Sequence, residues 1–431
     1  MSAHRLFVTI VLGMVAGALA QSQAPVYCPD VAPILQTHCL ACHRPGEIGP
    51  MALTSYAEAR RSSVAIAAAV ARRAMPPWFA NPAVGHWAND PSLSTAEIHT
   101  LAAWAAAGAP AGHGGCQPSA QSKSIWNIAP PQAVITMPGA VSLPARGEVA
   151  YTYEIVPTGW RQDRWVQMAE ARPSARSHVH HAVIYVRPPG SSWLKGAPVG
   201  VPFTAATLGV SRASLWTDAD ILLVYAPGSA PEAWTSKGGK TRGKLIPAGS
   251  DLVFQMHYTT DGHAAVDQTQ LGLVFNPTPP DEQVLTLQLT NDHFVIPPGV
   301  SDFRLEAHGS LPGGATLLGF FPHMHLRGKR FEYNLIAADG KPRPLLDVRW
   351  NFFWQRSYLL AQPLPLKAGT VLQAVAWYDN SRANPHNPDP DVAVHWGDQT
   401  TDEMMVGFFD VAVARGLDKW KYFAQRHSAA R

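Results

Sequence analysis

Histidines recur in the second half of the chain at positions where they could bind a metal ion. They open, lie inside or end apolar runs that alternate like β-strands: His178, His180, His181, His257, His323 and His325. One histidine on an apolar strand is more often a packed core residue than a ligand. Three separate clusters in a region without cysteine favour metal binding instead. Imidazole binds Zn, Cu, Fe or Ni, so the ligand type does not select the metal.

Strand geometry predicts which of these histidines can share an ion. Residues two apart on a strand point to the same face, so His323 and His325 could bind one ion without rearrangement. His180 and His181 point to opposite faces of a regular strand and would need a β-bulge or a strand end there. Regular alternation by itself favours His178 with His180.

A second kind of chemistry is indicated near the N-terminus by Cys39-Leu40-Ala41-Cys42-His43, a C-x-x-C-H motif. Two thiols on one helical turn can form thioethers to both vinyl groups of a haem, and His43 can be its proximal ligand. A redox dithiol would need a βαβ pattern, which is absent. Half of a zinc site would need a second cysteine pair, which does not follow.

The haem iron also needs a sixth ligand. Met75 lies in the Pro-rich segment Ala74-Met75-Pro76-Pro77-Trp78, which ends a helical pattern. A thioether held there suits low-spin haem, so Met75 is the predicted ligand. Met51 is the alternative, and His38 is a weaker third candidate.

The motif, Asp30-Val31-Ala32-Pro33-Ile34-Leu35 and Met-Pro-Pro-Trp together resemble the small cytochrome c modules of bacterial redox enzymes. The resemblance covers residues 24–116. It implies a small all-α domain with one haem held by Cys39, Cys42, His43 and Met75. Cys28 and Cys116 bracket this segment, and in an oxidising compartment a disulfide between them would fasten its ends.

The composition indicates the elements that position these residues. The 431 residues include 38 prolines but only 15% charged residues, and their net charge is +3. A broad basic nucleic-acid surface and long charged helices fit poorly, whereas short strands joined by turns fit well. We expect a linker at 117–126 and two all-β sandwich domains at 127–285 and 286–431.

Residues 1–20 have a positive start, an apolar run and a small-x-small end, Ala18-Leu19-Ala20, as signal peptides do. That run is shorter than the ~20 residues needed to cross a bilayer. We expect a periplasmic or secreted bacterial protein with no membrane span in the mature chain.

The order of the C-terminal motifs is specific. A His-x-His-His strand, Gln-Met-His-Tyr, a His-x-His pair and Asp-Glu-Met resemble the copper type II, ascorbate-dependent monooxygenases over residues 145–415. The resemblance implies that the two sandwich domains are jelly-roll-like and that each holds one copper, the two coppers facing each other across a solvent-filled cleft. The matching ligands are His180, His181 and His257 for the electron-donating copper, and His323, His325 and Met404 for the oxygen-activating copper.

Three positions depart from the peptide-hydroxylating members of that family. Phe321, Val406 and Phe408 stand where those members have an Arg, an Asn and a Tyr. Without the Arg a buried substrate carboxylate would have no partner, so the expected substrate is a neutral or apolar small molecule.

The sequence therefore predicts an exported copper monooxygenase that hydroxylates a C–H bond with O₂. It would bind two copper ions and one c-type haem. The haem would pass electrons from an external donor to the coppers. The alternative is a periplasmic electron-transfer or copper-binding protein without turnover. A zinc hydrolase would need a carboxylate beside the His-x-His pair, which is lacking.

Overall fold

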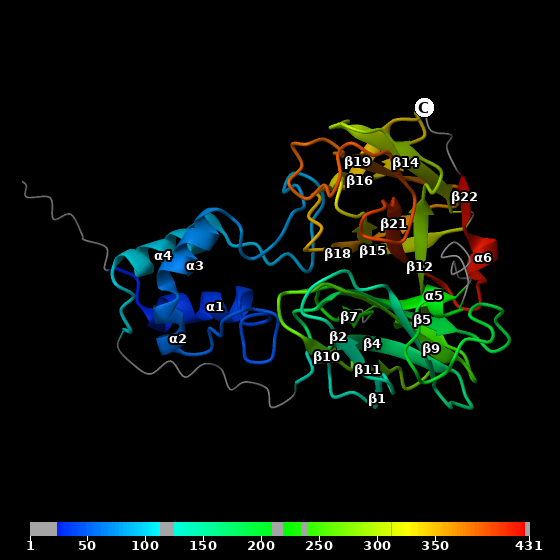
Figure 1. Cartoon of the computed structure of the whole chain (residues 1–431), viewed down its shortest axis with the longest axis horizontal. Coiled ribbons are helices and arrows are strands. Elements are labelled where there is room, and N and C mark those ends of the chain that lie inside the picture. The colour runs from blue at the N-terminus through cyan, green and yellow to red at the C-terminus, as the bar shows by residue number, and fades with distance from the viewer. Residues whose placement is uncertain (1–23, 113–124, 209–218, 235–238, 312, 427–431) are drawn as a thin grey trace, which may run out of the picture.

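The computed structural model describes residues 24–112, 125–208, 219–234, 239–311 and 313–426. Strands account for 38% of the structure and helices for 12%. The strands form two sandwiches, and an N-terminal segment with short helices lies beside them (Figure 1). The predicted signal peptide, Cys116 and most of the predicted linker lie outside the described residues.

The N-terminal helices are short and have clear local causes. Ser55 and Ser94 each form a capping box with the glutamate three residues later. The elements are η1 (Tyr27–Val31), α1 (Ala32–His38), α2 (Tyr56–Arg61), α3 (Ser63–Ala71) and α4 (Thr95–Ala106).

The predicted separate all-α cytochrome c domain is wrong, because the helices are part of a mostly β structure. After α3 the chain leaves the helices, and Trp78, Phe79 and Trp87 pack against the core of the second sandwich. Isolated β-bridges join Ala80 to Val348 and Trp87 to Leu360 in the same region. Apolar side chains in and after the Pro-rich segment thus pack against the sandwich, which helical periodicity could not reveal. The β-sandwich part of the predicted fold class agrees with the structure.

The first sandwich has two facing sheets whose inner side chains form one core. One sheet contains β1 (Ala133–Thr136), β4 (Arg164–Arg172), β7 (Glu232–Ala233), β8 (Arg242–Ile246) and β11 (Gln270–Phe275). The other contains β3 (Thr152–Pro157), β5 (Val179–Arg187), β6 (Asp220–Tyr225) and β9 (Asp251–Tyr258). The pair β2 (Val141–Leu143) and β10 (Ala265–Asp267) and the helix α5 (Ala205–Leu208) complete it.

The second sandwich is built in the same way. One sheet contains β12 (Glu282–Thr290), β15 (Ala315–His323), β18 (Tyr358–Leu366) and β21 (Val406–Ala414). The other contains β14 (Phe303–Ser310), β16 (Gly328–Ile336), β17 (Pro342–Arg349), β19 (Val371–Tyr378) and β22 (Ala424–Arg426). The small elements are β13 (Val295–Ile296), β20 (Val394–His395) and α6 (Lys419–Tyr422).

The two sandwiches share a sheet. β8 pairs in parallel with β12 through Arg242 opposite Glu282 and Gly243 opposite Gln283, so one nine-stranded sheet runs through both. Continuous pairing of this kind holds the facing sides of the sandwiches in a fixed relation.

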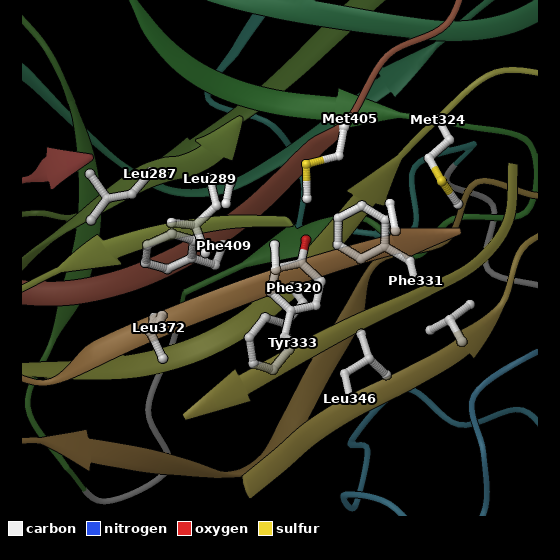
Figure 2. Close-up of a cluster of buried hydrophobic side chains, with 14 of the residues drawn as sticks. Leu287, Leu289, Phe320, Met324, Phe331, Tyr333, Leu346, Leu372, Met405 and Phe409 are labelled. Atoms are coloured by element: carbon white, nitrogen blue, oxygen red, sulfur yellow. The ribbon is translucent and has the colours of Figure 1, made fainter. Parts of the chain in front are cut away.

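The core of the second sandwich determines which way the site residues point. Figure 2 shows Phe320, Phe331, Tyr333 and Phe409 packed together with Met324 and Met405 at one end of the cluster. Because side chains alternate along extended chain, the neighbours of Met324 and Met405 point away from this core. Among the described residues, no helix is long and apolar enough to cross a membrane.

Candidate metal centre

A β-bulge in β5 brings three histidines together. Val179 lies opposite Tyr258 and His181 lies opposite His257, so His180 is an extra residue in β5. The bulge lets His180 and His181 turn to the same side, which regular alternation would forbid. His257 reaches the group from β9 through the register of the pair.

The three imidazoles of this first histidine group point their Nδ1 atoms inward. Nδ1 of His181 lies 3.1 Å from Nδ1 of His180 and 3.4 Å from Nδ1 of His257. One ligand atom from each residue lies within 4.8 Å of the others. Metal–imidazole bonds of about 2.0–2.1 Å place neighbouring nitrogens about 3.3–3.6 Å apart in tetrahedral or trigonal geometry. The group therefore fits a single metal ion.

Each Nε2 atom of the first group lies within hydrogen-bond distance of a residue outside the group. Nε2 of His180 donates to the Phe352 carbonyl at 2.9 Å, which leaves Nδ1 with a lone pair in the neutral ring. Nε2 of His257 lies 3.0 Å from Thr400 Oγ1, and Nε2 of His181 lies 3.3 Å from the Tyr151 hydroxyl. Such outer contacts fix ring orientation and tautomer in metal sites.

A second histidine group lies at the end of β15. His323 is its last residue, and His325 follows the core residue Met324, so alternation along the chain turns both histidines away from the core of the second sandwich. Their ring centroids are 5.3 Å apart. The prediction that these two histidines share a face agrees with this arrangement.

In this second group it is the Nδ1 atoms that lie within hydrogen-bond distance of residues outside the group. Nδ1 of His323 lies 2.8 Å from Gln355 Oε1, and Nδ1 of His325 lies 3.2 Å from the Asp402 carbonyl. Nε2 of His325 is buried and has no hydrogen-bond partner among the described residues. A buried polar atom without a partner is costly, and a bound metal ion would satisfy it.

The side chain of Glu403 connects the backbone segment around His325 to the segment that carries Met404. Its carboxylate accepts hydrogen bonds from the backbone N–H groups of His325 at 2.9 Å, of Arg327 at 2.6 Å and of Met404 at 3.2 Å. Burial raises the pKa of Glu403 to about 7, although these backbone donors oppose the shift. Sequence reasoning gave Glu403 no role, and it also missed Phe352 and Gln355, which no local pattern marks.

The two histidine groups are adjacent, which differs from the cleft that the family resemblance implies. The rings of His181 and His323 lie 5.4 Å apart between centroids. Burial lowers the pKa of His180 and of His323 to about 4, and the hydrogen bond that each ring donates to a carbonyl oxygen opposes part of that shift. Burial and neighbouring imidazoles lower the pKa of His181, His257 and His325 further. All five rings are therefore neutral at pH 7 and able to bind a metal.

A cavity of about 330 Å³ adjoins both groups. His181, His323 and Met404 line one part of it. Its apolar wall contains the three positions that depart from the peptide-hydroxylating enzymes, together with other apolar residues: Val183, Ile221, Val224, Leu287, Phe321, Val406 and Phe408. Gln255 lies at a polar edge, where it donates to the Tyr153 hydroxyl at 2.8 Å and accepts from the Tyr185 hydroxyl at 3.3 Å.

His178 lies apart from the metal centre. Its Nδ1 lies 3.0 Å from Ser177 Oγ and its Nε2 lies 2.9 Å from the His263 carbonyl, so both ring nitrogens have partners. The structure thus pairs His180 with His181 rather than with His178.

The C-x-x-C-H motif forms one turn after α1. The backbone N–H of His43 donates to the Cys39 carbonyl at 2.9 Å, and His43 Nδ1 lies 3.0 Å from the Met51 carbonyl. Cys39 and Cys42 are free thiols, whereas Cys28 is disulfide-bonded. Burial raises the pKa of Cys39 to about 12 and also raises that of Cys42. A redox dithiol needs the opposite shift, so these raised pKa values disfavour that role for the two thiols.

The three candidates for the sixth haem ligand are differently placed. Met75 lines a cavity of about 630 Å³, whose lining residues do not include the C-x-x-C-H residues. Met51 packs against the core of the helical segment. Both ring nitrogens of His38 have partners, the Pro91 carbonyl at 2.9 Å and Glu97 at 3.2 Å. The structure therefore does not bring Met75 and His43 to one cavity.

No protein-family model and no curated protein matches the sequence. Among solved structures, the chain is similar to the VP2 subviral particle of infectious bursal disease virus, with 10% identity over 69% of this chain and 77% of that chain and a TM-score of 0.19. A structure of the Gx strain of the same virus has 9% identity over the same shares and a TM-score of 0.16. Scores this low do not bear on function.

Proposed function

We propose that this chain is an exported copper-dependent monooxygenase that hydroxylates a C–H bond of a neutral, largely apolar small molecule. One observation carries the proposal: two groups of neutral, buried histidines meet beside an apolar cavity that Met404 also lines. In each of these rings one nitrogen contacts a residue outside the group. The overall reaction consumes one O₂, two electrons and two protons, and it releases the hydroxylated product and water.

The residues divide into two ligand sets. His180, His181 and His257 would hold one copper through Nδ1, and His323, His325 and Met404 would hold a second through Nε2 and the thioether. Copper bound there would supply one-electron redox chemistry and O₂ activation. Imidazole with one thioether is a donor set that accepts Cu(I) readily, and the absence of a carboxylate ligand disfavours Mg, Ca and Mn.

The cavity residues would select and orient the substrate. Phe321, Val406 and Phe408 form an apolar wall beside His323, so a C–H bond of an apolar group can approach the second ligand set. The amide of Gln255, already oriented by Tyr153 and Tyr185, would contact a polar group at the other end of the molecule. Lys419 also lines the cavity, but it already pairs with Asp220 at 3.1 Å. A carboxylate on the apolar wall would therefore be unpaired, at a cost of several kcal/mol.

Cys39, Cys42 and His43 would hold one c-type haem, which would supply electrons one at a time from an external donor. The Met51 carbonyl holds His43 Nδ1, so Nε2 is the nitrogen available to the iron. Met75 as the sixth ligand remains a prediction.

The test uses the full chain, matured with haem and loaded with copper. Oxygen uptake with a reduced donor, and mass spectrometry of a product library made with labelled O₂, should show one labelled oxygen atom in a hydroxylated product. His323→Ala should abolish product formation, and His178→Ala should retain it. If the protein binds its full complement of copper and haem but forms no product from any library, the electron-transfer or copper-binding alternative is supported instead.

A further inference from the structure

One loop contacts all three of the sites described above. The 350–357 loop joins β17 to β18. Its Phe352 stacks on His180 with ring centroids 4.1 Å apart and accepts from that ring through its carbonyl. Its Gln355 holds His323, and the indole Nε1 of its Trp350 donates to the His325 carbonyl at 3.0 Å. The loop thus supports both histidine groups.

The next residue of the loop extends to the C-x-x-C-H segment. Arg356 is buried, and its guanidinium donates to the Gly228 carbonyl. A Cβ atom at Gly228 would lie 2.7 Å from Arg356 Nη1 and 3.6 Å from Cys42 Sγ, so glycine at this position leaves room for both. The thiol of Cys42 and the guanidinium therefore approach the same point from two different parts of the fold.

Arg356 differs from three other arginines of this region, whose charges are each balanced by a carboxylate. Arg44, Arg172 and Arg176 all pair with Glu47. Among the described residues, no carboxylate forms an ion pair with Arg356. A guanidinium stays protonated at neutral pH, so a buried positive charge lies beside Cys42 without an anionic partner.

We propose that Arg356 is a positioning residue for the haem attached at Cys42, whose buried charge raises the haem reduction potential, and that the 350–357 loop links this effect to the occupancy of the histidine groups. The inference rests on the haem and copper binding proposed above. One-electron reduction of haem iron from Fe(III) to Fe(II) lowers the charge of the haem by one, so a nearby fixed positive charge favours the reduced form.

The link to the histidines follows from chain connectivity. Gln355 and Arg356 are consecutive, so a metal that fixes His323, and through it Gln355, also restricts the backbone that carries the guanidinium. Coupling between two sites is reciprocal, so haem reduction must change metal affinity at the histidines by the same factor as metal binding changes haem reduction.

The experiment measures the haem midpoint potential by anaerobic spectroscopic titration, in the full-length haem-bearing protein without copper and with Cu(I). Arg356→Met should lower the potential of the copper-free protein, and Arg356→Lys should restore most of it. Arg164→Met, which removes an exposed charge from β4, should leave it unchanged. Cu(I) should shift the potential of the wild type, and Gln355→Leu should reduce that shift.

The outcomes separate this inference from the proposed function. A haem-bearing Arg356→Met protein with the wild-type potential would overturn the role of Arg356, and the proposed function would stand. If copper binds to the wild type but leaves its haem midpoint potential unchanged, the link through the loop is overturned. Wild-type protein that attaches no haem under c-type maturation would instead overturn the proposed electron supply, and this inference with it.

Discussion

The imidazole ring of His181 lies 5.4 Å from that of His323, and this contact joins histidines from two different sandwiches. His181 comes from β5 in the first sandwich, whereas His323 ends β15 in the second. The parallel pairing of β8 with β12 makes one sheet continuous between the sandwiches, so the spacing of the two rings is a property of the whole β structure. Metal bound to one group would lie next to the other.

Removal of one ligand should separate true ligands from neighbouring histidines. His257→Ala should lose one copper per chain, because it deletes one of three converging Nδ1 atoms. His178→Ala should keep the full copper content, because its ring nitrogens already bond Ser177 and the His263 carbonyl. Metal analysis after dialysis measures the stoichiometry, and equal copper in both variants would contradict the assigned first group.

Copper should also stabilise the fold. A ligand at about 100 times its Kd raises the free energy of unfolding by about 2.7 kcal/mol if it binds only the folded state. Wild-type protein with Cu(I) should show this gain in chemical denaturation, and a chelator should reverse it. The His257→Ala variant should gain less, and an identical gain would show that the metal binds elsewhere.

Gln355 should control metal affinity at the second group without being a ligand. Gln355→Leu removes the acceptor that holds His323 Nδ1, and loss of such an outer contact typically weakens metal binding about 10–100-fold. Gln355→Glu keeps an acceptor at that position and should bind copper more tightly than the Leu variant. Competition with a Cu(I) chelator measures the affinities; wild-type affinity in the Leu variant would exclude the positioning role.

The cavity should discriminate against carboxylates. A pair of small ligands with the same apolar body, one ending in an amide and the other in a carboxylate, should differ by at least about 100-fold in affinity. Phe321→Arg should reduce or reverse this preference, because the new guanidinium can pair with the carboxylate. Equilibrium binding to the copper-loaded protein reports the ratio, and equal affinities in the wild type would rule out the apolar wall as the selective element.

Glu154 should make stability depend on pH. Its side chain is buried, Oε1 accepts from Gly139 N–H at 2.7 Å, and Oε2 has no hydrogen-bond partner among the described residues. Burial raises its pKa above the ordinary 4.5, although the Gly139 bond opposes the shift. A raised pKa means that stability is fully present below the unfolded-state pKa and falls as the pH rises through the folded-state value.

Glu154→Gln should remove this pH-dependent loss and keep the acceptor for Gly139. Denaturation of copper-free protein should show the wild type losing stability relative to the variant between pH 4 and pH 8. A constant difference across that range would mean that Glu154 does not titrate in it.

The N-terminal segment should depend on Glu47 for its attachment to the first sandwich. Glu47 pairs with Arg172 at 3.1 Å and with Arg176, and its side chain is only 6% exposed. Loss of one partner of a buried ion pair costs about 3–5 kcal/mol. Glu47→Gln should therefore increase hydrogen exchange in residues 39–50. Asp391→Asn, which removes the exposed partner of Arg382, should have little effect anywhere.

The amino-acid sequence by itself determined the chemistry that is available. The C-x-x-C-H spacing places two thiols and an imidazole on one turn, and the spacing of His323 and His325 places both rings on one face, because local backbone geometry decides both. The low charge and the Pro/Gly turns between alternating runs likewise predicted the sandwiches.

The tertiary structure alone decided which residues meet. The bulge at His180 depends on how β5 pairs with β9, and it replaces His178 by His181 as the partner of His180. Phe352, Gln355 and Arg356 act on residues that are distant in sequence, so no local periodicity marks them. Trp78 and Trp87 pack, partly buried, against the core of the second sandwich rather than within a separate helical domain. Long-range contacts set these features, and short-range patterns specify only the elements that make those contacts.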